Sequence, residues 1–504
     1  MTNIPFKNSI LSWMMKKRIH QIDLFRKYPI KTQEDVFGNL VEKGKYTSFG
    51  EEHSFATISS YSDFCNQVPV RTYEELFPYI NRLREGEKDV LWPGKVKWFA
   101  KSSGTTNDRS KYIPISKESL EDCHFKGGKD MLSLYCTNFP ETKIFNGKGL
   151  MLGGSQWENP FQNYEEGDLS AILINNFPFW VNIHRTPNLE IALLKDWELK
   201  LEKIVEQSIN ENVTNLTGVP SWMLLLINRV LKKTGAKNIM EVWPNLELYM
   251  HGGINFNPYK HQFKKLIPSS KMNYLEAYNA SEGFFGIKDQ KDSNDLLLML
   301  DYGIFYEFIE IRKFNEGNRD CIPLSEVKVK NIYVIVISTN AGLWRYLIGD
   351  TIRFSSISPY RIRIVGRTKS YINTFGEELM VENTEDAINK CSELNFCSIK
   401  NYSAAPEFLT DSSGRHQWLI EFNTPPLSLQ KFELDLDSEI RKLNSDYDAK
   451  RNNDFILKNL KIIPAKEGVF YKWLKNNDRL GGQYKVPRLF NDNKIFFQIL
   501  ELNR

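Results

Sequence analysis

The sequence predicts an α/β protein with a large N-terminal part, which ends in a β-rich region, and a smaller α+β part at the C-terminus. A chain of 504 residues is long enough for two to four folding units. Between Val96 and Ala277 short apolar segments alternate with amphipathic helical patterns, which favours mixed sheets flanked by helices. From Phe305 the apolar residues recur with a period near two. We therefore expect domains at residues 1–366 and 367–504.

The composition is that of a globular protein without a nucleic-acid partner. Hydrophobic residues make up 41% and charged residues 25% of the chain, and 66 basic against 62 acidic residues give a net charge of +4. No basic stripe typical of nucleic-acid-binding domains is present. The longest apolar runs, such as 223–227 and 333–337, are far shorter than the roughly 18 residues that a membrane span needs. We therefore expect no membrane partner either.

The six cysteines form no metal-binding or disulfide pattern. No two cysteines have C-x-x-C spacing, and no two histidines have H-x-x-x-H spacing. The first 30 residues contain no apolar stretch of the signal-peptide type. We therefore expect free thiols in a cytoplasmic protein.

The N-terminal region predicts helices, then two strands joined by a polar loop. Residues 9–28 carry apolar side chains on one helical face, and TYEE (72–75) resembles the start of another helix. Val96–Lys101 has the pattern of a strand and leads into SSGTT (102–106). Lys111–Ile115 is extended again, so the polar segment lies between two strands.

The rest of the chain alternates strands and helices. Further strands are predicted at 149–152, 216–219, 246–250, 272–277, 333–337 and 418–422, and as short strands in the C-terminal tail. Helices are predicted at 197–208, from Pro220, at 382–391 and at 429–443. No internal repeat and no low-complexity tract is present.

The polar loop SSGTT is a candidate phosphate site. Its hydroxyls and backbone N–H groups can donate to phosphate oxygens, and Gly104 allows a close approach of the backbone. Lys111 follows shortly after the loop and adds a positive charge. The chain contains no G-x-x-x-x-G-K-[ST], so this is not a Walker A loop. An ordinary Ser/Thr-rich turn is the alternative interpretation.

Two later segments place a carboxylate beside an aromatic residue or a glycine. In YNASEG (278–283), Tyr278 can stack on a purine and Glu282 can bind Mg²⁺. In WRYLIGD (344–350), Asp350 follows a glycine turn and can accept the two hydroxyls of a ribose. The alternatives are an exposed glutamate and, for the second segment, a surface turn in which Arg345 and Asp350 form a solvated pair.

Two further segments are candidates for a hinge and for a mobile cation. Gly366-Arg367 and GEE (376–378) lie near the predicted domain boundary, where glycines absorb changes in backbone dihedral angles. In QYKVPR (483–488), Lys485 lies on an extended segment before a proline and can present its ammonium group to an anion. A solvated lysine is the alternative.

The order of these motifs resembles the adenylate-forming superfamily of acyl and aryl ligases. SSGTT, YNASEG, WRYLIGD and QYKVPR are more closely similar to the auxin-responsive acyl acid amido synthetases, the Gretchen-Hagen-three family with its bacterial members. The motifs span residues 102–488, so the resemblance covers most of the chain. It implies a large N-terminal adenylate-forming domain and a smaller, mobile C-terminal domain.

The resemblance also implies a role for each matching residue. The ATP phosphates would lie against Ser102, Ser103, Gly104, Thr105, Thr106 and Lys111. Tyr278 would line the adenine site and Asp350 would hold the ribose. Ser281, Glu282 and Lys485 would act at the reacting carboxylate and α-phosphate, with Glu282 also binding Mg²⁺. The acyl substrate would be bound by Val219, Trp222, His251, Gly252 and Gly253. A buried apolar turn for Trp222 and a satisfied core histidine for His251 are the alternatives.

One segment departs from the family pattern. Family members often have further glycines after SSGT, whereas this chain has Asn107, Asp108 and Arg109. The loop is therefore expected to be stiffer, with a negative charge near the phosphates that Arg109 or Lys111 can offset.

The activity that the resemblance implies is ATP-dependent, AMP-forming synthesis of an amide from a carboxylic acid and an amino acid. The expected co-substrate and metal are ATP and Mg²⁺, and we expect a monomer that acts on small molecules. An acid–CoA ligase and a non-catalytic sensor of nucleotide or acid are the two alternatives. The lack of a G-x-S-x-G motif agrees with a reaction that needs no covalent enzyme nucleophile.

Overall fold

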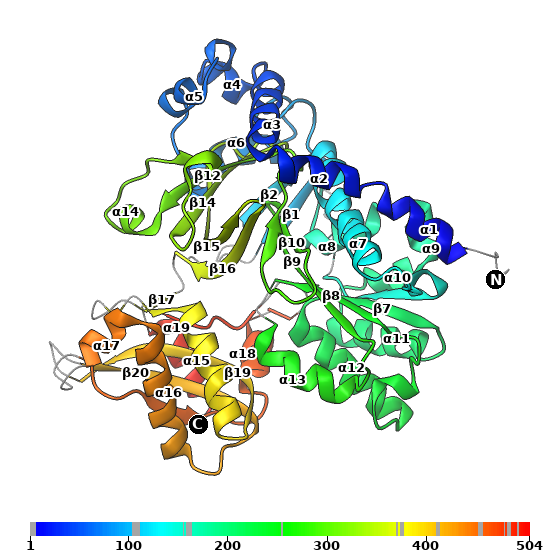
Figure 1. Ribbon diagram of the computed structural model, residues 1–504, viewed down its shortest axis with the longest axis vertical. Coiled ribbons are helices and arrows are strands. Elements are labelled where there is room, and N and C mark those ends of the chain that lie inside the picture. Colours follow the sequence, from blue (N-terminus) through cyan, green and yellow to red (C-terminus); the bar gives the residue numbers. More distant parts are fainter. Residues whose placement is uncertain are drawn as a thin grey trace.

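The computed structural model describes residues 7–102, 111–154, 156–157, 164–253, 256–368, 371–372, 377, 379–409, 414–451, 457–477, 479–480, 485–490 and 493–504. None of the helices in these ranges is both long enough and apolar enough to span a bilayer. The structure combines large sheets with packed helices, which confirms the predicted α/β class (Figure 1).

The main sheet has twelve strands and changes character at its middle. Its order is β13-β12-β14-β15-β16-β11-β10-β9-β8-β7-β3-β6. The parallel half contains β6 (Arg185–Thr186), β3 (Lys148–Met151), β7 (Val213–Thr217), β8 (Leu248–Gly252) and β9 (Asn273–Ala280). The antiparallel half contains β10 (Gly283–Lys288), β11 (Leu296–Leu298), β16 (Tyr360–Arg367), β15 (Tyr346–Ile357), β14 (Ile332–Thr339), β12 (Ile304–Glu310) and β13 (Ile322–Pro323). The predicted change to a β-rich region is this change of strand direction.

Helices cover both faces of the parallel half. One face packs against α11 (Trp197–Ser208), α12 (Pro220–Thr234) and α13 (Asn257–Leu266). The other face packs against a π-helical turn, η2 (Ser119–Phe125), and α7 (Lys126–Asn138). Parallel strands that are covered on both sides are typical of α/β proteins. Shorter helical segments join these elements: α8 (Leu169–Asn175), α9 (Phe179–Ile183), α10 (Leu189–Ala192), α14 (Ile311–Asn315), η3 (Ile144–Asn146), η4 (Ile239–Glu241) and η5 (Leu324–Glu326).

A second sheet has the order β2-β1-β5-β4. It consists of β1 (Trp98–Ser102), β2 (Lys111–Ile115), β5 (Glu165–Gly167) and β4 (Gln156–Trp157). The antiparallel pairing of β1 with β2 confirms the two strands predicted around the polar loop, and Ser102 pairs with Lys111.

The N-terminal helices pack over the antiparallel half and α7. They are α1 (Lys7–Lys16), α2 (Ile19–Lys27), α3 (Pro29–Gly44), α4 (Ser48–Glu52), η1 (Phe55–Thr57), α5 (Tyr61–Gln67) and α6 (Tyr73–Arg84). The helical pattern predicted at 9–28 is confirmed as two helices, α1 and α2, and the Arg18 side chain between them enters the core and binds Asp130 at 3.0 Å. The predicted helix start at 72–75 is confirmed, since Thr72 and Glu75 form a capping box.

The C-terminal part has its own three-stranded sheet. This sheet has the order β19 (Ser398–Phe408), β20 (Gly414–Thr424) and β21 (Lys461–Pro464), and β17 (Tyr371–Ile372) and β18 (Leu379–Met380) form a separate pair. The helices of this part are α15 (Val381–Leu394), α16 (Leu429–Leu443), α17 (Ser445–Arg451), α18 (Val469–Asn476) and α19 (Lys494–Glu501). Of the short strands predicted for the tail, the described residues show β21 and a single bridge between Leu489 and Ala404, and two helices, α18 and α19, take up most of the rest. In α18 the buried residues are Val469, Phe470, Trp473 and Leu474, a helical spacing.

The C-terminal part packs on the N-terminal part through α18, which shares an apolar cluster with α11–α13, and through α15, which contacts α13 and β16. Phe470, Trp473 and Phe496 belong to the same apolar cluster as α11–α13. At its edge Tyr471 lies edge-on to Trp222, and its hydroxyl donates to Glu198 on α11. Figure 1 shows α18 (red-orange) beside the green helix α13.

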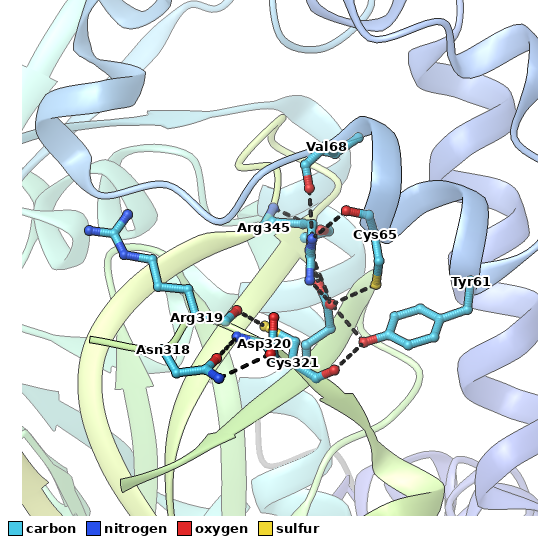
Figure 2. Close-up of polar contacts among 10 residues, drawn as sticks. Tyr61, Cys65, Val68, Asn318, Arg319, Asp320, Cys321 and Arg345 are labelled. Atoms are coloured by element: carbon cyan, nitrogen blue, oxygen red, sulfur yellow. Dashed lines mark hydrogen bonds and ion pairs between the residues drawn. The ribbon is translucent and has the colours of Figure 1, made fainter. Parts of the chain in front are cut away.

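A buried ion pair anchors the start of β15 (Figure 2). The Arg345 guanidinium binds the Glu307 carboxylate at 2.8–3.1 Å, and both residues are almost completely buried. The other terminal nitrogen of the Arg345 guanidinium donates to the carbonyl oxygens of Val68 at 2.7 Å and Cys65 at 3.3 Å, at the end of α5. Tyr61 also donates to Glu307 at 2.9 Å. The alternative of a solvated pair between Arg345 and Asp350 is therefore wrong.

Replacing Arg345 by Met is expected to lower the free energy of unfolding by about 3–5 kcal/mol, because Glu307 then stays buried without a counter-charge. Urea unfolding followed by tryptophan fluorescence measures the change. Arg319→Met is the control: its ion pair with Glu75 is about half exposed, so its effect should stay below about 1 kcal/mol. Equal losses in both variants would contradict the prediction.

Candidate active site

A cavity of about 2790 Å³ lies between the main sheet and the C-terminal part. Its lining includes the predicted residues Val219, Trp222, His251, Gly252, Gly253, Tyr278, Ser281, Glu282, Asp350 and Lys485. These residues come from positions 219–485, so the fold brings together segments that are far apart in the sequence. Ligand sites in α/β proteins are typically found where the carboxyl ends of parallel strands open onto such a crevice.

The YNASEG segment forms a hairpin instead of a loop after a strand. β9 continues through Tyr278 to Ala280, and Ser281 and Glu282 form the two-residue turn before β10. The parallel and antiparallel halves of the sheet meet at this hairpin. Ser281 is buried and Glu282 is half-buried, so a carboxylate stands at the edge of the cavity. Desolvation raises the pKa of Glu282, while the charge of Lys111 opposes the shift.

Asp350 connects three strands. Its carboxylate accepts hydrogen bonds from the Tyr278 hydroxyl at 2.7 Å and from the Arg367 guanidinium at 2.8 Å. Asp350 and Arg367 are direct partners on β15 and β16, whereas Tyr278 lies on β9. Since β10, β11 and β16 separate β9 from β15 in the strand order, only a strongly curved sheet brings these side chains together. Asp350 lies inside a strand, not after a turn as predicted, although Gly349 has a positive φ of 87°.

Tyr346 stands between two predicted site residues. Its hydroxyl lies 3.5 Å from the ammonium group of Lys111 and 3.5 Å from a carboxylate oxygen of Glu282. Tyr346 is fully buried at the start of β15, directly after the anchored Arg345. The distances are long for hydrogen bonds, and contacts of this kind commonly shorten when a ligand binds. The hydroxyl can thus orient the carboxylate and the lysine toward one ligand.

Lys485 is the one predicted site residue that the C-terminal part contributes. Its ammonium group donates to the carbonyl oxygen of Gly253 inside the cavity. Desolvation and the charge of Arg367 lower the pKa of Lys485 to about 8, against the attraction of Asp350. Gly253 has a φ of 83°, and a Cβ atom there would lie 3.4 Å from the ammonium group. Such a Cβ atom would make only an ordinary contact with the ammonium group, so the backbone conformation, and not the space that Lys485 occupies, requires the glycine.

Two of the predicted acyl-binding residues, His251 and Gly252, are neighbours at the end of β8 and belong to opposite faces of the sheet. Gly252 lies against β9, where a Cβ atom would stand 2.5 Å from the Ala277 carbonyl oxygen. His251 is buried and stacks on Phe256 with ring centroids 4.1 Å apart. Burial lowers the pKa of His251 to about 3, and its Nδ1 has no hydrogen-bond partner among the described residues, in contrast to the alternative of a satisfied core histidine.

Val219 and Trp222 lie at the start of α12. Pro220 occupies the first turn, as predicted. Trp222 is buried in the apolar cluster of α11–α13 and lies edge-on to Trp197 at 4.9 Å. Within the described part of the chain its indole N–H has no partner, so a buried apolar turn describes its packing but leaves one donor unused.

The phosphate loop is only partly described. Ser102 ends β1 and Lys111 begins β2, and these two residues pair across the strands at the two ends of the loop. Ser103, Gly104, Thr105 and Thr106 lie outside the described residues, as do Asn107, Asp108 and Arg109.

The structure adds Arg367 and Tyr346 to the site. Gly366-Arg367 was predicted as a hinge, but both residues belong to β16, where Gly366 pairs with Thr351. Of the second predicted hinge segment, Glu377 is fully buried and binds His416 at 2.8 Å, while Gly376 and Glu378 lie outside the described residues. A charged residue next to a glycine was the only signal for Arg367, and it does not reveal a cross-strand partner.

The ammonium group of Lys485 is expected to titrate near pH 8, well below an ordinary lysine. In Asp350→Asn the pKa should fall further, because the attraction that favours the charged form is lost; in Arg367→Met it should rise, because a repulsion is lost. NMR of the protein with isotopically methylated lysines measures both shifts. Shifts of the same sign in the two variants would contradict this arrangement.

Comparison with known families identifies the chain. The GH3 family N-terminal domain matches residues 18–272, the central domain matches residues 297–367, and the C-terminal domain matches residues 382–494. The N-terminal model alone covers half of the chain. The resemblance found in the sequence motifs is thus confirmed.

Curated relatives match over nearly their whole length. The jasmonoyl–L-amino acid synthetase JAR6 of Nicotiana attenuata is 24% identical, with 97% of this chain and 96% of the relative covered. The indole-3-acetic acid-amido synthetase GH3.4 of Arabidopsis thaliana is 22% identical, with coverage of 94% and 91%.

Solved structures show the same fold. The acyl acid amido synthetase AtGH3.15 in complex with 2,4-DB has a TM-score of 0.78 at 16% identity and covers 100% of this chain and 97% of its own. A 2-hydroxyisobutyryl-CoA ligase in the postadenylation state has a TM-score of 0.59 at 12% identity, with coverage of 93% and 91%. Because the family models match in chain order from residue 18 to residue 494, the chain belongs to the GH3 family.

Proposed function

We propose that the protein is an ATP-dependent, AMP-forming ligase that adenylates a carboxylic acid and joins it to an amino acid. The observation that carries the proposal is one cavity lined by Glu282, by the Tyr278–Asp350–Arg367 cluster and by Lys485. The relatives named jasmonoyl– and indole-3-acetic acid-amido synthetases support the reaction class.

The residues present fit MgATP. Asp350 has its two carboxylate oxygens at a point where ribose hydroxyls can replace or join its partners, and Tyr278 lies next to it. Glu282 is a half-buried carboxylate near Lys111, a setting that suits a cation held beside phosphates. Mg²⁺, when bound, would neutralise charge on the departing pyrophosphate. The phosphate loop that begins at Ser102, together with Lys111, would hold the phosphates.

In the first half-reaction a carboxylate oxygen of the acid attacks the α-phosphorus of ATP. The bond from the α-phosphorus to the bridging oxygen breaks, and pyrophosphate leaves with the electron pair. Lys485, held over Gly253, would stabilise the negative charge that builds up on the α-phosphoryl oxygens. Tyr346 would keep Lys111 and Glu282 oriented toward the phosphates.

In the second half-reaction an amino acid attacks the acyl carbon of the mixed anhydride. The new C–N bond forms, the bond to the AMP oxygen breaks, and the amine loses a proton. AMP is a good leaving group because its phosphate carries the charge. No side chain of the enzyme becomes covalently attached.

We also propose that the C-terminal part beyond β16 forms a domain that rotates between the two half-reactions, while Arg367, the last residue of β16, stays with the main sheet. This part has its own sheet and its own apolar core, and in the observed arrangement its Lys485 reaches the cavity. A rotation has to break the contacts of Tyr471 with Glu198 and Trp222. It also has to break part of the apolar packing of α18 against the N-terminal part. The six free cysteines agree with a cytoplasmic location, and we keep a monomer as the working state.

The decisive experiment measures pyrophosphate release from MgATP with a panel of carboxylic acids, with and without amino acids, and identifies the products by mass spectrometry. The wild type should release pyrophosphate with at least one acid and form an amide and AMP. Lys485→Ala and Glu282→Ala should each lower kcat by roughly 100-fold or more, since each removes charge stabilisation at the reacting phosphates.

Other outcomes separate the alternatives. Turnover that needs CoA and yields a thioester would assign an acid–CoA ligase. Binding of ATP and acid without any pyrophosphate release would assign a sensor. Both outcomes would overturn the amido synthetase.

Tyr346→Phe is expected to lower kcat for pyrophosphate release roughly tenfold and to raise the Mg²⁺ concentration needed for half-maximal rate, because the hydroxyl that contacts both Lys111 and Glu282 is lost. Steady-state kinetics over a Mg²⁺ series measures both quantities. Tyr306→Phe is the matched control: Tyr306 is equally buried, and its hydroxyl donates only to the Met299 carbonyl oxygen. Indistinguishable kinetics in the two variants would remove Tyr346 from the site.

A further inference from the structure

One buried arginine on the cavity wall has no counter-charge. Four arginines in the described part of the chain are almost completely buried: Arg18, Arg185, Arg345 and Arg451. Three of them bind carboxylates: Arg18 binds Asp130 and Asp301, Arg345 binds Glu307, and Arg451 binds Asp437. Arg185, only 4% exposed, forms no ion pair with any described residue. Since a buried charge is normally paired, Arg185 needs another explanation.

The partners of Arg185 hold its guanidinium without neutralising it. Nε donates to the Asn182 side-chain oxygen at 2.7 Å, and one terminal nitrogen donates to the Pro187 carbonyl oxygen at 2.8 Å. These contacts use part of the five donors of the group. Desolvation lowers the pKa of Arg185 from its ordinary value, and no carboxylate offsets the shift. The guanidinium is fixed in place with donors left over, which is the arrangement expected of an anion-binding arginine.

Arg185 lies at the far end of the sheet face that forms the floor of the cavity. On β6 it pairs with Gly149 on β3, Gly149 pairs with Asn215 on β7, and Asn215 pairs with Leu248 on β8. Gly149 contributes no side chain, and the Asn215 amide occupies the space above it, 2.6 Å from where a Cβ atom would lie. Arg185, Gly149 and Asn215 all line the cavity. They form a polar row at the edge of the sheet.

An apolar lobe separates this row from the reacting residues. Its floor is the next row of the same face, Met151, Thr217 and Met250, which are partners on β3, β7 and β8. Its roof includes Phe125 and Phe177, whose rings lie 5.5 Å apart, and all these residues line the cavity. Gly252 is four residues beyond Leu248 on β8, and three strand spacings separate β8 from β6, so the Cα atoms of Gly252 and Arg185 are about 20 Å apart. The lobe therefore suits an elongated molecule.

A buried histidine lies in the wall of the cavity near Phe125. His124, in the π-helical turn next to Phe125, is 4% exposed, and its Nδ1 has no hydrogen-bond partner. Burial lowers the pKa of His124 to about 4, so the ring is neutral at physiological pH and both donates and accepts. The wall beside Phe125 and Phe177 therefore carries no charge at His124.

We infer that the acyl substrate is an elongated carboxylic acid with a second carboxylate at the end remote from the reacting group, and that Arg185 binds this second carboxylate. The inference rests on the proposed function, because it takes the reacting carboxylate to lie near Lys485 and Gly253. The distal carboxylate would supply the missing counter-charge of Arg185. The apolar lobe would enclose the chain or ring between the two ends of the acid.

The test compares two pairs of acids that differ only in the distal group: sebacic with decanoic acid, and dodecanedioic with dodecanoic acid. Pyrophosphate release without amino acid gives kcat/KM for each acid, and calorimetry measures binding of the two diacids without ATP. In the wild type one diacid should be preferred over its monoacid. Arg185→Met should lower kcat/KM for that diacid about 10- to 100-fold, and leave the monoacid unchanged or improved, because a charge-assisted hydrogen bond is lost only with the diacid.

Two further variants control for folding. Arg185→Gln keeps a donor for Asn182 and Pro187 but removes the charge, so it should lose the preference for the diacid as Arg185→Met does. Asn182→Ala removes one partner and keeps the charge, so it should retain the preference. Binding of the diacid should be lost in both charge-removing variants, while circular dichroism stays that of the wild type.

Three outcomes would overturn the inference. The first is adenylation of monoacids with no preference for either diacid. The second is an unchanged preference in Arg185→Met. The third is an effect confined to the KM of the amino acid, which would move Arg185 to the acceptor. The proposed function would survive all three, since pyrophosphate release and amide formation are measured independently of the preference; it fails only if no acid is turned over.

Discussion

The carboxylate of Asp350 is the interaction on which the geometry of the site depends. It receives the Arg367 guanidinium from the neighbouring strand and the Tyr278 hydroxyl from the other half of the sheet, and its charge attracts Lys485. Without it, the charges of Arg367 and Lys485 would repel each other with no carboxylate between them. A buried carboxylate that accepts several hydrogen bonds is stable only when its partners stay in place, so Asp350 also fixes the curvature that brings β9 to β15.

Two structural features support this cluster from outside. The hairpin between β9 and β10 marks the change from parallel to antiparallel strands, and its short turn presents Ser281 and Glu282 to the cavity. The Arg345–Glu307 pair closes the other side, because it ties the end of α5 to β12 and sets the backbone just before Tyr346 (Figure 2). Arg345 has a positive φ of 44°, a strained value for a side chain of this size that strong buried contacts can maintain.

The cavity itself combines opposite environments. Charged groups gather where Lys485 and Arg367 face Asp350, whereas the floor between them and β6 carries Met151 and Met250. This division separates the place where charge is transferred from the place where a substrate is recognised. Arg185 is the exception within the apolar region, and an isolated buried guanidinium there has a clear physical reason only if a ligand brings the opposite charge.

The sequence by itself determined the class of fold, the family and most of the local elements. Apolar periodicity located strands such as 333–337 and helices such as 429–443, because each pattern depends only on neighbours along the chain. The ordered motifs pointed to the residues that line the cavity. The phosphate-loop residues 103–106 lie outside the described structure.

Only the tertiary structure decided which charges meet. Arg345 binds Glu307 and Arg367 binds Asp350, although Arg345 and Asp350 are five positions apart in one motif. The missing partner of Arg185 is likewise invisible in the sequence, since nothing near position 185 indicates which side chains face it across the fold. The reason is physical: a helix or strand follows from contacts within a few residues, whereas the pairing and burial of a charge depend on strands that are joined by sheet register and curvature.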